Sequence, residues 1–255
     1  MKERLEAVIL DWAGTTLDYG CMAPAVVFKK VFAEMGVPIT TEEARRPMGA
    51  HKKVHVRKIT EDSAVQDRWN KYYGRNPTEE DVEKMFQSFV HAQIACLAEY
   101  ADLIPGTLEA VAEFNKKGLK IGSTTGYTGD MMKVLMAEAE KRGYVPDVTV
   151  CATGHYALRN GKIQGPLLGY GDNISRPKPA MCNLNAYLLN VSDNAAVVKV
   201  GDTLDDIREG KRAGMWTIAL AGTGNEMYLG EDDGLTEEQI RSKNPNGYIK
   251  KLRAA

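Results

Sequence analysis

The stretch Ala7-Val8-Ile9-Leu10-Asp11-Trp12-Ala13-Gly14-Thr15-Thr16 decides the fold of this chain. Its first four residues are all apolar, which predicts a strand that is buried on both faces. Asp11 follows at once, and a turn of small residues comes after it. Open α/β sheets bind their ligands at the carboxyl ends of the strands, so Asp11 stands where a ligand would lie. A single acid at such a point is often only a turn residue, and its meaning depends on the rest of the chain.

A helical pattern fills the next part of the chain, from about Cys21 to Tyr100. An apolar stripe at Val26–Met35 marks the first helix, which Gly36 ends. The later helices are expected to begin at Thr41 and to cover about 49–60, 63–73 and 78–100. Because this insert comes directly after the acid at the strand end, we expect a separate helical domain that lies over a site.

From Leu103 onward, short apolar segments alternate with helical ones. The expected strands are 119–123, 148–151, 195–200 and 215–220, and the expected helices are 106–118, 129–143, 180–189 and 205–213. This alternation predicts an α/β fold with a doubly wound, Rossmann-like parallel sheet. The expected domains are a core of residues 1–20 and 101–255 and an all-helical cap of residues 21–100. A loop or small β-excursion is expected at 152–175, and a short helix at 236–243.

The composition narrows the class of protein. The chain has 255 residues, 44% of them hydrophobic and 26% charged, with a net charge of −1. A net charge this close to zero does not favour binding to nucleic acid, and no apolar run approaches the ~20 residues of a membrane span. The first residues are charged and lack the apolar core of a signal peptide. The four cysteines are widely scattered, as expected of free thiols, so we expect a cytoplasmic protein.

Polar motifs occur at four points where ligand-binding side chains could converge. They are Asp11, Ser123-Thr124-Thr125-Gly126, Arg176-Pro177-Lys178-Pro179 and Gly201-Asp202-Thr203-Leu204-Asp205-Asp206. Each alone has a plain structural explanation, such as capping or favouring the start of a helix. Together they supply what phosphoryl transfer needs. A carboxylate can attack phosphorus, a hydroxyl and a cation can hold the phosphoryl oxygens, and an acid pair can hold Mg²⁺.

These motifs, in this order, resemble those of the haloacid dehalogenase superfamily of phosphohydrolases. The resemblance implies that Asp11 is the nucleophile and that Asp205 belongs only to a helix start. The phosphate-binding residues would be Thr15, Thr125, Gly126 and Arg176. The Mg²⁺ site would comprise Asp11, Ala13, Asp202 and Asp206.

Ala13 departs from the pattern of most phosphatases in that superfamily. They carry a second Asp two residues after the nucleophile, which protonates an alkoxide leaving group. The alanine therefore implies that the leaving group is not an alkoxide, or that the protein is not a phosphatase.

The run Pro47-Met48-Gly49-Ala50-His51-Lys52-Lys53-Val54-His55 lies inside the helical insert. On a helix, its spacing places Met48, Lys52 and His55 on one face. A lysine beside a histidine suggests an amine kept neutral for Schiff-base chemistry, although a solvated lysine is the commoner reason for such spacing. A reactive amine needs a pKa below the usual ~10.4, at ~1.4 kcal/mol per unit, and burial between the domains could supply it.

The segments 11–21, 48–55, 123–128 and 201–203 closely resemble the phosphonoacetaldehyde hydrolase family. The resemblance implies hydrolysis of the C–P bond of phosphonoacetaldehyde, with an imine between Lys52 and the aldehyde, and a homodimer packed through the cap. Supporting roles would fall to His55, Met48, Cys21 and Tyr127. Ala13 then fits, because C–P cleavage expels an enamine and the iminium is the electron sink.

Other interpretations remain open from the sequence. The chain could hydrolyse another small phosphonate or phosphate ester without an imine, or it could bind phosphate-bearing ligands without catalysis. The apolar stripe 26–35, with Trp69, Tyr72 and Tyr73, could form a dimer face or simply the core of the cap.

Overall fold

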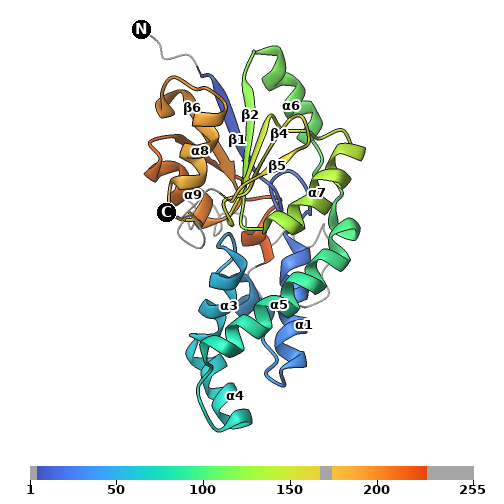
Figure 1. Ribbon diagram of the computed structural model, residues 1–255, viewed down its shortest axis with the longest axis vertical. Coiled ribbons are helices and arrows are strands. Elements are labelled where there is room, and N and C mark those ends of the chain that lie inside the picture. Colours follow the sequence, from blue (N-terminus) through green and yellow to red (C-terminus); the bar gives the residue numbers. More distant parts are fainter. Residues whose placement is uncertain (1–4, 167–173, 229–255) are drawn as a thin grey trace.

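Figure 1 shows the computed structural model, in which a sheet flanked by helices lies on one side of a helical insert. The structure describes residues 5–166 and 174–228. The strands are β1 (Ala7–Asp11), β2 (Lys120–Thr125), β3 (Val148–Cys151), β4 (Tyr156–Leu158), β5 (Ile163–Gln164), β6 (Val197–Gly201) and β7 (Trp216–Ala219). The helices are α1 (Met22–Glu34), α2 (Thr41–Arg45), α3 (Lys52–Thr60), α4 (Ser63–Tyr73), α5 (Glu79–Cys96), α6 (Thr107–Lys116), α7 (Gly129–Lys141), α8 (Ala180–Leu188) and α9 (Leu204–Arg212), with 3₁₀ turns η1 (Leu97–Tyr100), η3 (Asn194–Ala196) and η4 (Asn225–Tyr228).

The strands form one sheet in the order β5-β4-β3-β2-β1-β6-β7. The pairs β1–β2, β1–β6, β2–β3 and β6–β7 are parallel, so the carboxyl ends of β1, β2, β3, β6 and β7 meet at one edge. Of the stretch 152–175, which was expected to be a loop or a small β-excursion, β4 and β5 extend the sheet with antiparallel pairing, and residues 167–173 lie outside the described residues. The predicted α/β fold with a mostly parallel sheet is therefore confirmed.

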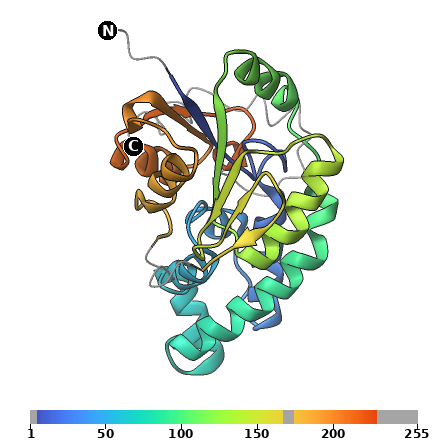
Figure 2. The same ribbon diagram turned by 45° about the horizontal axis from the view of Figure 1, so that its top comes forward.

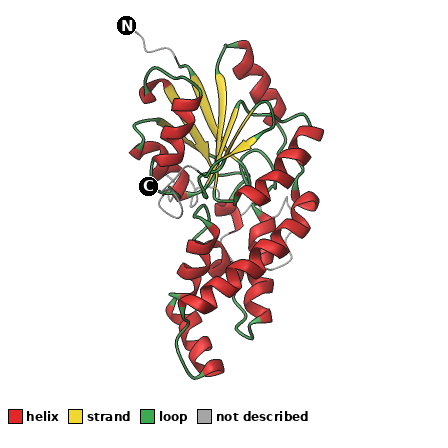
Figure 3. Ribbon diagram, viewed as in Figure 1, coloured by secondary structure: helices red, strands yellow, loops and turns green. Residues whose placement is uncertain are grey.

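The central strand β1 is covered on both faces, as its unbroken apolar run requires. Val8 and Leu10 pack into one apolar cluster, which includes residues of α7. Ala7 and Ile9 pack into the other, which includes residues of α8. Figures 2 and 3 show helices on both sides of the sheet. The alternation of side chains along a strand thus divides one short apolar run between two cores.

Helices α1–α5 form a cap beyond the carboxyl ends of the parallel strands (Figures 1 and 3). Two capping boxes fix the starts of α2 and α5. In them, the side chains of Thr40 and Glu43, and those of Thr78 and Asp81, hydrogen-bond to backbone N–H groups at the start of the helix. The helix expected over 49–60 begins only at Lys52, because residues 47–51 form a turn. None of the described helices is long and apolar enough to cross a membrane.

The aromatic residues of the cap divide between its core and its surface. Trp69 is fully buried, and the ring of Phe28 stacks on that of Phe89 at a centroid distance of 4.1 Å. Val26 and Tyr72 are exposed by 43% and 63% of their surface. Trp69 therefore belongs to the core of the cap. The helix expected at 236–243 lies outside the described residues.

Candidate active site

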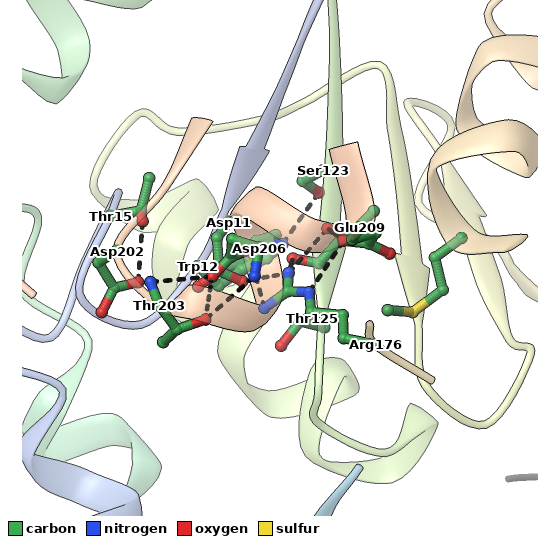
Figure 4. A network of polar contacts seen from close by, with 12 residues as sticks. Asp11, Trp12, Thr15, Ser123, Thr125, Arg176, Asp202, Thr203, Asp206 and Glu209 are labelled. Atoms are coloured by element: carbon green, nitrogen blue, oxygen red, sulfur yellow. Dashed lines mark hydrogen bonds and ion pairs between the residues drawn. The ribbon is translucent and has the colours of Figure 1, made fainter. Parts of the chain in front are cut away.

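The site forms where the carboxyl ends of the central strands meet the cap. Asp11 ends β1, directly opposite Thr124 of the neighbouring β2, and Asp202 follows β6 on the other side. Ligand atoms of Asp11, Asp202 and Asp206 all lie within 4.8 Å of one another, and all three side chains are buried. Figure 4 shows these side chains converging from different elements. The parallel sheet thus brings together three of the four motifs.

Arg176 brings in the fourth motif and lies at the centre of an ion-pair network (Figure 4). Its guanidinium nitrogens lie 2.6 Å from Asp11 Oδ1, 3.0 Å from Asp206 Oδ1 and 3.0 Å from Glu209 Oε2. It also donates to the carbonyl and hydroxyl oxygens of Thr124, each at 2.7 Å. Burial opposes its charge, but the three carboxylates outweigh burial and raise the pKa of Arg176 well above its usual value. Arg176 is therefore a fixed positive charge beside Asp11.

Two charged residues of this network were not predicted from the sequence. Lys199 in β6 donates to Asp206 Oδ1 at 2.6 Å, and Glu209 in α9 accepts from Arg176. Both side chains are fully buried. A signal existed for each, since Lys199 interrupts an apolar strand and Glu209 comes one helical turn after Asp206.

The acids of the network outnumber its cations, and a divalent cation could balance the excess negative charge. Four acids (Asp11, Asp202, Asp206 and Glu209) face two cations (Arg176 and Lys199), so full ionisation leaves two negative charges in a buried space. Burial and the neighbouring carboxylates of Asp11 and Asp206 raise the pKa of Asp202 well above its usual value. Carboxylate oxygens are what hard divalent cations prefer, so the residues fit such a metal. Ala13 could offer it only a backbone carbonyl.

Asp202 is held from two sides. Thr15 donates its hydroxyl to Asp202 Oδ1 at 3.1 Å, and the backbone N–H of Asn225 donates to Oδ2 at 2.7 Å. Gly14 has φ +89°, and a Cβ there would lie 2.3 Å from Asp202 Oδ2. Glycine at this turn is therefore required by both the backbone conformation and the space that Asp202 fills.

The cap is closed on the core at two glycines. A Cβ on Gly126 would lie 2.6 Å from the carbonyl oxygen of Ala50, and one on Gly49 would lie 2.6 Å from Thr203 Oγ1. The backbone of the turn 47–51 therefore lies directly against the loops that follow β2 and β6. Thr125, next to Gly126, accepts the backbone N–H of Tyr127 on its hydroxyl at 3.2 Å.

Lys52 is buried at this interface, with only 4% of its surface exposed. Its Nζ lies 4.0 Å from Met48 Sδ and 4.9 Å from the ring centroid of Tyr127. Burial lowers the pKa of Lys52 to about 8, and the charges of Asp11 and Arg176 act on it in opposite directions. Met48 reaches the lysine from the turn before α3, and not from the helix that the sequence predicted.

His55, one turn after Lys52 in α3, is fully buried against Phe28, with ring centroids 3.9 Å apart. Its Nε2 lies 2.8 Å from the carbonyl oxygen of Ala44, so this nitrogen carries the proton. Burial, with the charge of Lys52, lowers the pKa of His55 well below its usual value, which keeps the ring neutral. Its Nδ1 has no hydrogen-bond partner among residues 5–166 and 174–228, and is therefore an unused acceptor.

Cys21 and Tyr127 are both buried near this amine and both stay protonated. Burial, with the charges of Asp202 and Asp18, raises the pKa of the Cys21 thiol. Burial also raises the pKa of Tyr127, whose hydroxyl has no hydrogen-bond partner in the described parts of the chain. The structure thus places weak, protonated donors around Lys52.

Asp18 was not predicted from the sequence, and it lies four residues before the start of α1 at Met22. Its carboxylate accepts the backbone N–H groups of Met22 at 2.9 Å and Ala23 at 3.1 Å, at the start of α1. Burial raises the pKa of Asp18 to about 7.

Comparisons with known proteins agree with this geometry. The family described as haloacid dehalogenase-like hydrolase matches residues 5–214. The chain is 43% identical to a phosphonoacetaldehyde hydrolase of Bacillus cereus over 239 residues, which cover 94% of this chain and 82% of that protein. It is 44% identical to one of Syntrophobacter fumaroxidans over 241 residues, which cover 94% and 81%. The crystal structure of a phosphonoacetaldehyde hydrolase like protein from Oleispira antarctica matches with a TM-score of 0.82 and 34% identity, covering 98% of this chain and 83% of that one.

Proposed function

The chain belongs to the phosphonoacetaldehyde hydrolases of the haloacid dehalogenase-like hydrolase family, and we propose that it acts through an imine on Lys52 and an aspartyl-phosphate on Asp11. The products would be acetaldehyde and phosphate. The observation that carries this mechanism is the amine of Lys52, which is buried where the cap closes on the core and is acted on by the charges of Asp11 and Arg176.

The first step would be attack of the neutral Lys52 amine on the aldehyde carbon, with loss of water. With a pKa of about 8, about half of this amine is neutral at pH 8, against about 0.3% for an unperturbed lysine. His55 Nδ1 is a hydrogen-bond acceptor with no partner among the described residues, while Cys21 and Tyr127 are protonated donors. Met48 covers the amine with a thioether that competes weakly for hydrogen bonds.

The second step would be attack of Asp11 on phosphorus, with cleavage of the C–P bond. The bonding pair moves into the carbon skeleton and onto the iminium nitrogen, giving an enamine, so no proton is needed from the position of Ala13. Arg176 would neutralise charge on the transferring group. Water then hydrolyses the aspartyl-phosphate, and the enamine is protonated on carbon and hydrolysed as an imine.

The phosphoryl oxygens would be bound by Thr15, Thr125, Gly126 and Arg176. We propose Mg²⁺ as the cofactor, held by Asp11, Asp202, Asp206 and the carbonyl of Ala13, where it would neutralise charge shared by the phosphonate and Asp11.

Reduction with borohydride in the presence of phosphonoacetaldehyde tests the imine. We expect peptide mapping to find the reduced adduct on Lys52. The matched control is its neighbour Lys53, whose Nζ pairs with Glu83 at 2.8 Å near the surface of the cap. Lys53→Arg should leave labelling unchanged, whereas Lys52→Arg should abolish it. A label on Lys53, or no label on the wild-type chain, would contradict the mechanism.

The proposed domains are a core of residues 1–20 and 101–255 and a cap of residues 21–100. Their support is that β1 ends at Asp11, α1 begins at Met22 and α6 begins at Thr107.

We also propose a homodimer through the cap, since Val26 and Tyr72 are exposed there. A molecular mass of one chain, measured by light scattering, would contradict this proposal. The free thiols of all four cysteines suit the cytoplasm.

A further inference from the structure

Residues 222–226, which we name the strap, contact in succession the connection at Tyr19–Gly20 that precedes α1, the acid Asp202 and the cap. Gly222 accepts the hydroxyl of Tyr19 at 3.0 Å, and the carbonyl of Thr223 accepts the backbone N–H of Gly20 at 2.8 Å. Asn225 then donates its backbone N–H to Asp202 Oδ2. The strap therefore connects the residues that lead into α1 of the cap, Tyr19 and Gly20, with Asp202, a predicted metal ligand.

The cap reaches the strap through Arg45, the last residue of α2. Its Nη1 donates to the carbonyl of Gly20 at 2.7 Å and to Asn225 Oδ1 at 3.2 Å. Asn225 Nδ2 donates back to the carbonyl of Arg45 at 3.3 Å. Arg45 and Asn225 are each only 1% exposed. The side chain of Asn225 is thus paired with the cap, while its backbone is paired with Asp202.

Little space separates the strap from Asp202. A Cβ on Gly224 would lie 2.0 Å from the Cβ of Asp202. A displacement of Asn225 would therefore be transmitted to the Asp202 carboxylate by both a hydrogen bond and direct packing.

We propose that Asn225 is a positioning residue that couples closure of the cap to the orientation of Asp202, with Arg45 as its partner in the cap. Opening the cap would remove both hydrogen bonds between Arg45 and the Asn225 side chain and leave Asn225 Nδ2 only its contact with Glu226 Oε1 at 3.5 Å. The strap would then no longer hold the N–H of residue 225 on Asp202. Because coupling between two equilibria is reciprocal, metal binding would favour the closed cap as strongly as closure favours metal binding.

Asn is suited to this position because it offers one donor and one acceptor to the two groups of Arg45. Asp would place a second oxygen against the carbonyl of Arg45, and Ala would offer neither group. Hydrogen-bond partners behind metal ligands commonly contribute 10–100-fold to metal affinity.

Calorimetric titration of the substrate-free enzyme with Mg²⁺ tests the coupling. We expect Asn225→Ala and Arg45→Ala each to weaken Mg²⁺ binding by about 10–100-fold. The double variant should bind no more weakly than either single variant, since both remove the same link. Arg45→Lys, which keeps the charge, should recover part of the affinity.

The matched control is Arg57 in α3, which pairs with Glu79 at 2.8 Å on the surface of the same cap. Arg57→Ala should leave Mg²⁺ binding unchanged. Arg45→Met keeps the volume of the side chain and carries the test if Arg45→Ala does not fold. Wild-type Mg²⁺ affinity in a folded Arg45 variant, or additive effects in the double variant, would overturn the proposal.

This coupling rests on the proposed function only for the place of the Mg²⁺ site. The titration needs neither substrate nor Lys52, so the two can fail separately. A missing label on Lys52, with the coupling intact, would overturn the imine mechanism alone. Labelled Lys52, with Mg²⁺ binding that is insensitive to Arg45, would overturn the coupling alone.

Discussion

At the scale of single residues, burial decides the chemistry of Lys52. A lysine on the surface of a helix keeps its proton at neutral pH, whereas this one loses water on all sides when the cap meets the core. Desolvation disfavours the ammonium form and brings the pKa to about 8. The neighbouring Lys53 has nearly the same local sequence and pairs with a glutamate instead. The difference between them is which face of α3 they occupy.

The pKa of Lys52 gives a direction for the pH dependence of imine formation. Because the neutral amine is the reactive form, the rate of borohydride trapping at fixed substrate concentration should rise with pH and level off above about 8. The measurement is the initial rate of adduct formation between pH 6 and 10 in a mixed buffer of constant ionic strength. An inflection near 10 would show that the amine is not desolvated before substrate binds.

At the scale of elements, helix starts position the site. At the start of α1, Asp18 accepts the backbone N–H of Met22 and Cys21 occupies the position before the helix. α9 begins with a capping box in which Thr203 and Asp206 satisfy each other's backbone groups. The same Asp206 carboxylate faces Arg176 and Lys199. A local capping rule therefore fixes an acid that the site also uses.

Replacing Asp18 by Asn tests the charge at the start of α1. The pKa of Asp18 is raised from 3.8 to about 7, so the folded protein binds this proton more tightly than the unfolded chain does. The stability that Asp18 contributes is thus full below about pH 4 and is lost as the pH rises to about 7. The shift corresponds to about 4 kcal/mol. Urea unfolding should show the stability of wild type relative to Asp18→Asn falling over this range, and a constant difference would contradict the assignment.

At the scale of the whole molecule, the candidate site combines residues of the core with residues of the cap. Asp11 ends β1, the acids Asp206 and Glu209 lie in α9, and Arg176 pairs with all three, whereas Lys52 and His55 lie in α3 of the cap. The turn 47–51 touches the core at Gly126 with no space for a side chain. The contact between cap and core therefore buries the Lys52 amine, and the charge of Asp11 in the core acts on the pKa of that amine.

Gly126→Ala tests the importance of this close approach. Its Cβ would meet the backbone of Ala50 and hold the cap away from the core, so we expect kcat/KM to fall by about 100-fold or more. Steady-state assay of acetaldehyde release measures it. The control is Gly118→Ala, where φ is +71° but no atom lies within 4 Å of the new Cβ. That variant should lose about 1 kcal/mol of stability and keep its kinetics, and equal kinetics in both variants would contradict the argument.

Much of the site was predictable because its motifs are local. The run 7–10 predicted a buried strand, and its length placed Asp11 at the end of that strand. The strand at 148–151 and the helix at 63–73 were predicted with the bounds that the structure has. By contrast, the start of α3 was misplaced, because the turn 47–51 is shaped by contact with Gly126 and Thr203 and not by its own periodicity.

The sequence by itself determined the α/β fold, the helical insert and the acid at the end of β1, because strand and helix signals act between residues a few positions apart. Only the tertiary structure decided which charges meet. Arg176 lies 165 residues along the chain from Asp11, and Arg45 lies 180 residues from Asn225, yet each pair is in contact. Burial lowered the pKa of Lys52, and that burial depends on the packing of the cap against the core, which no local pattern records.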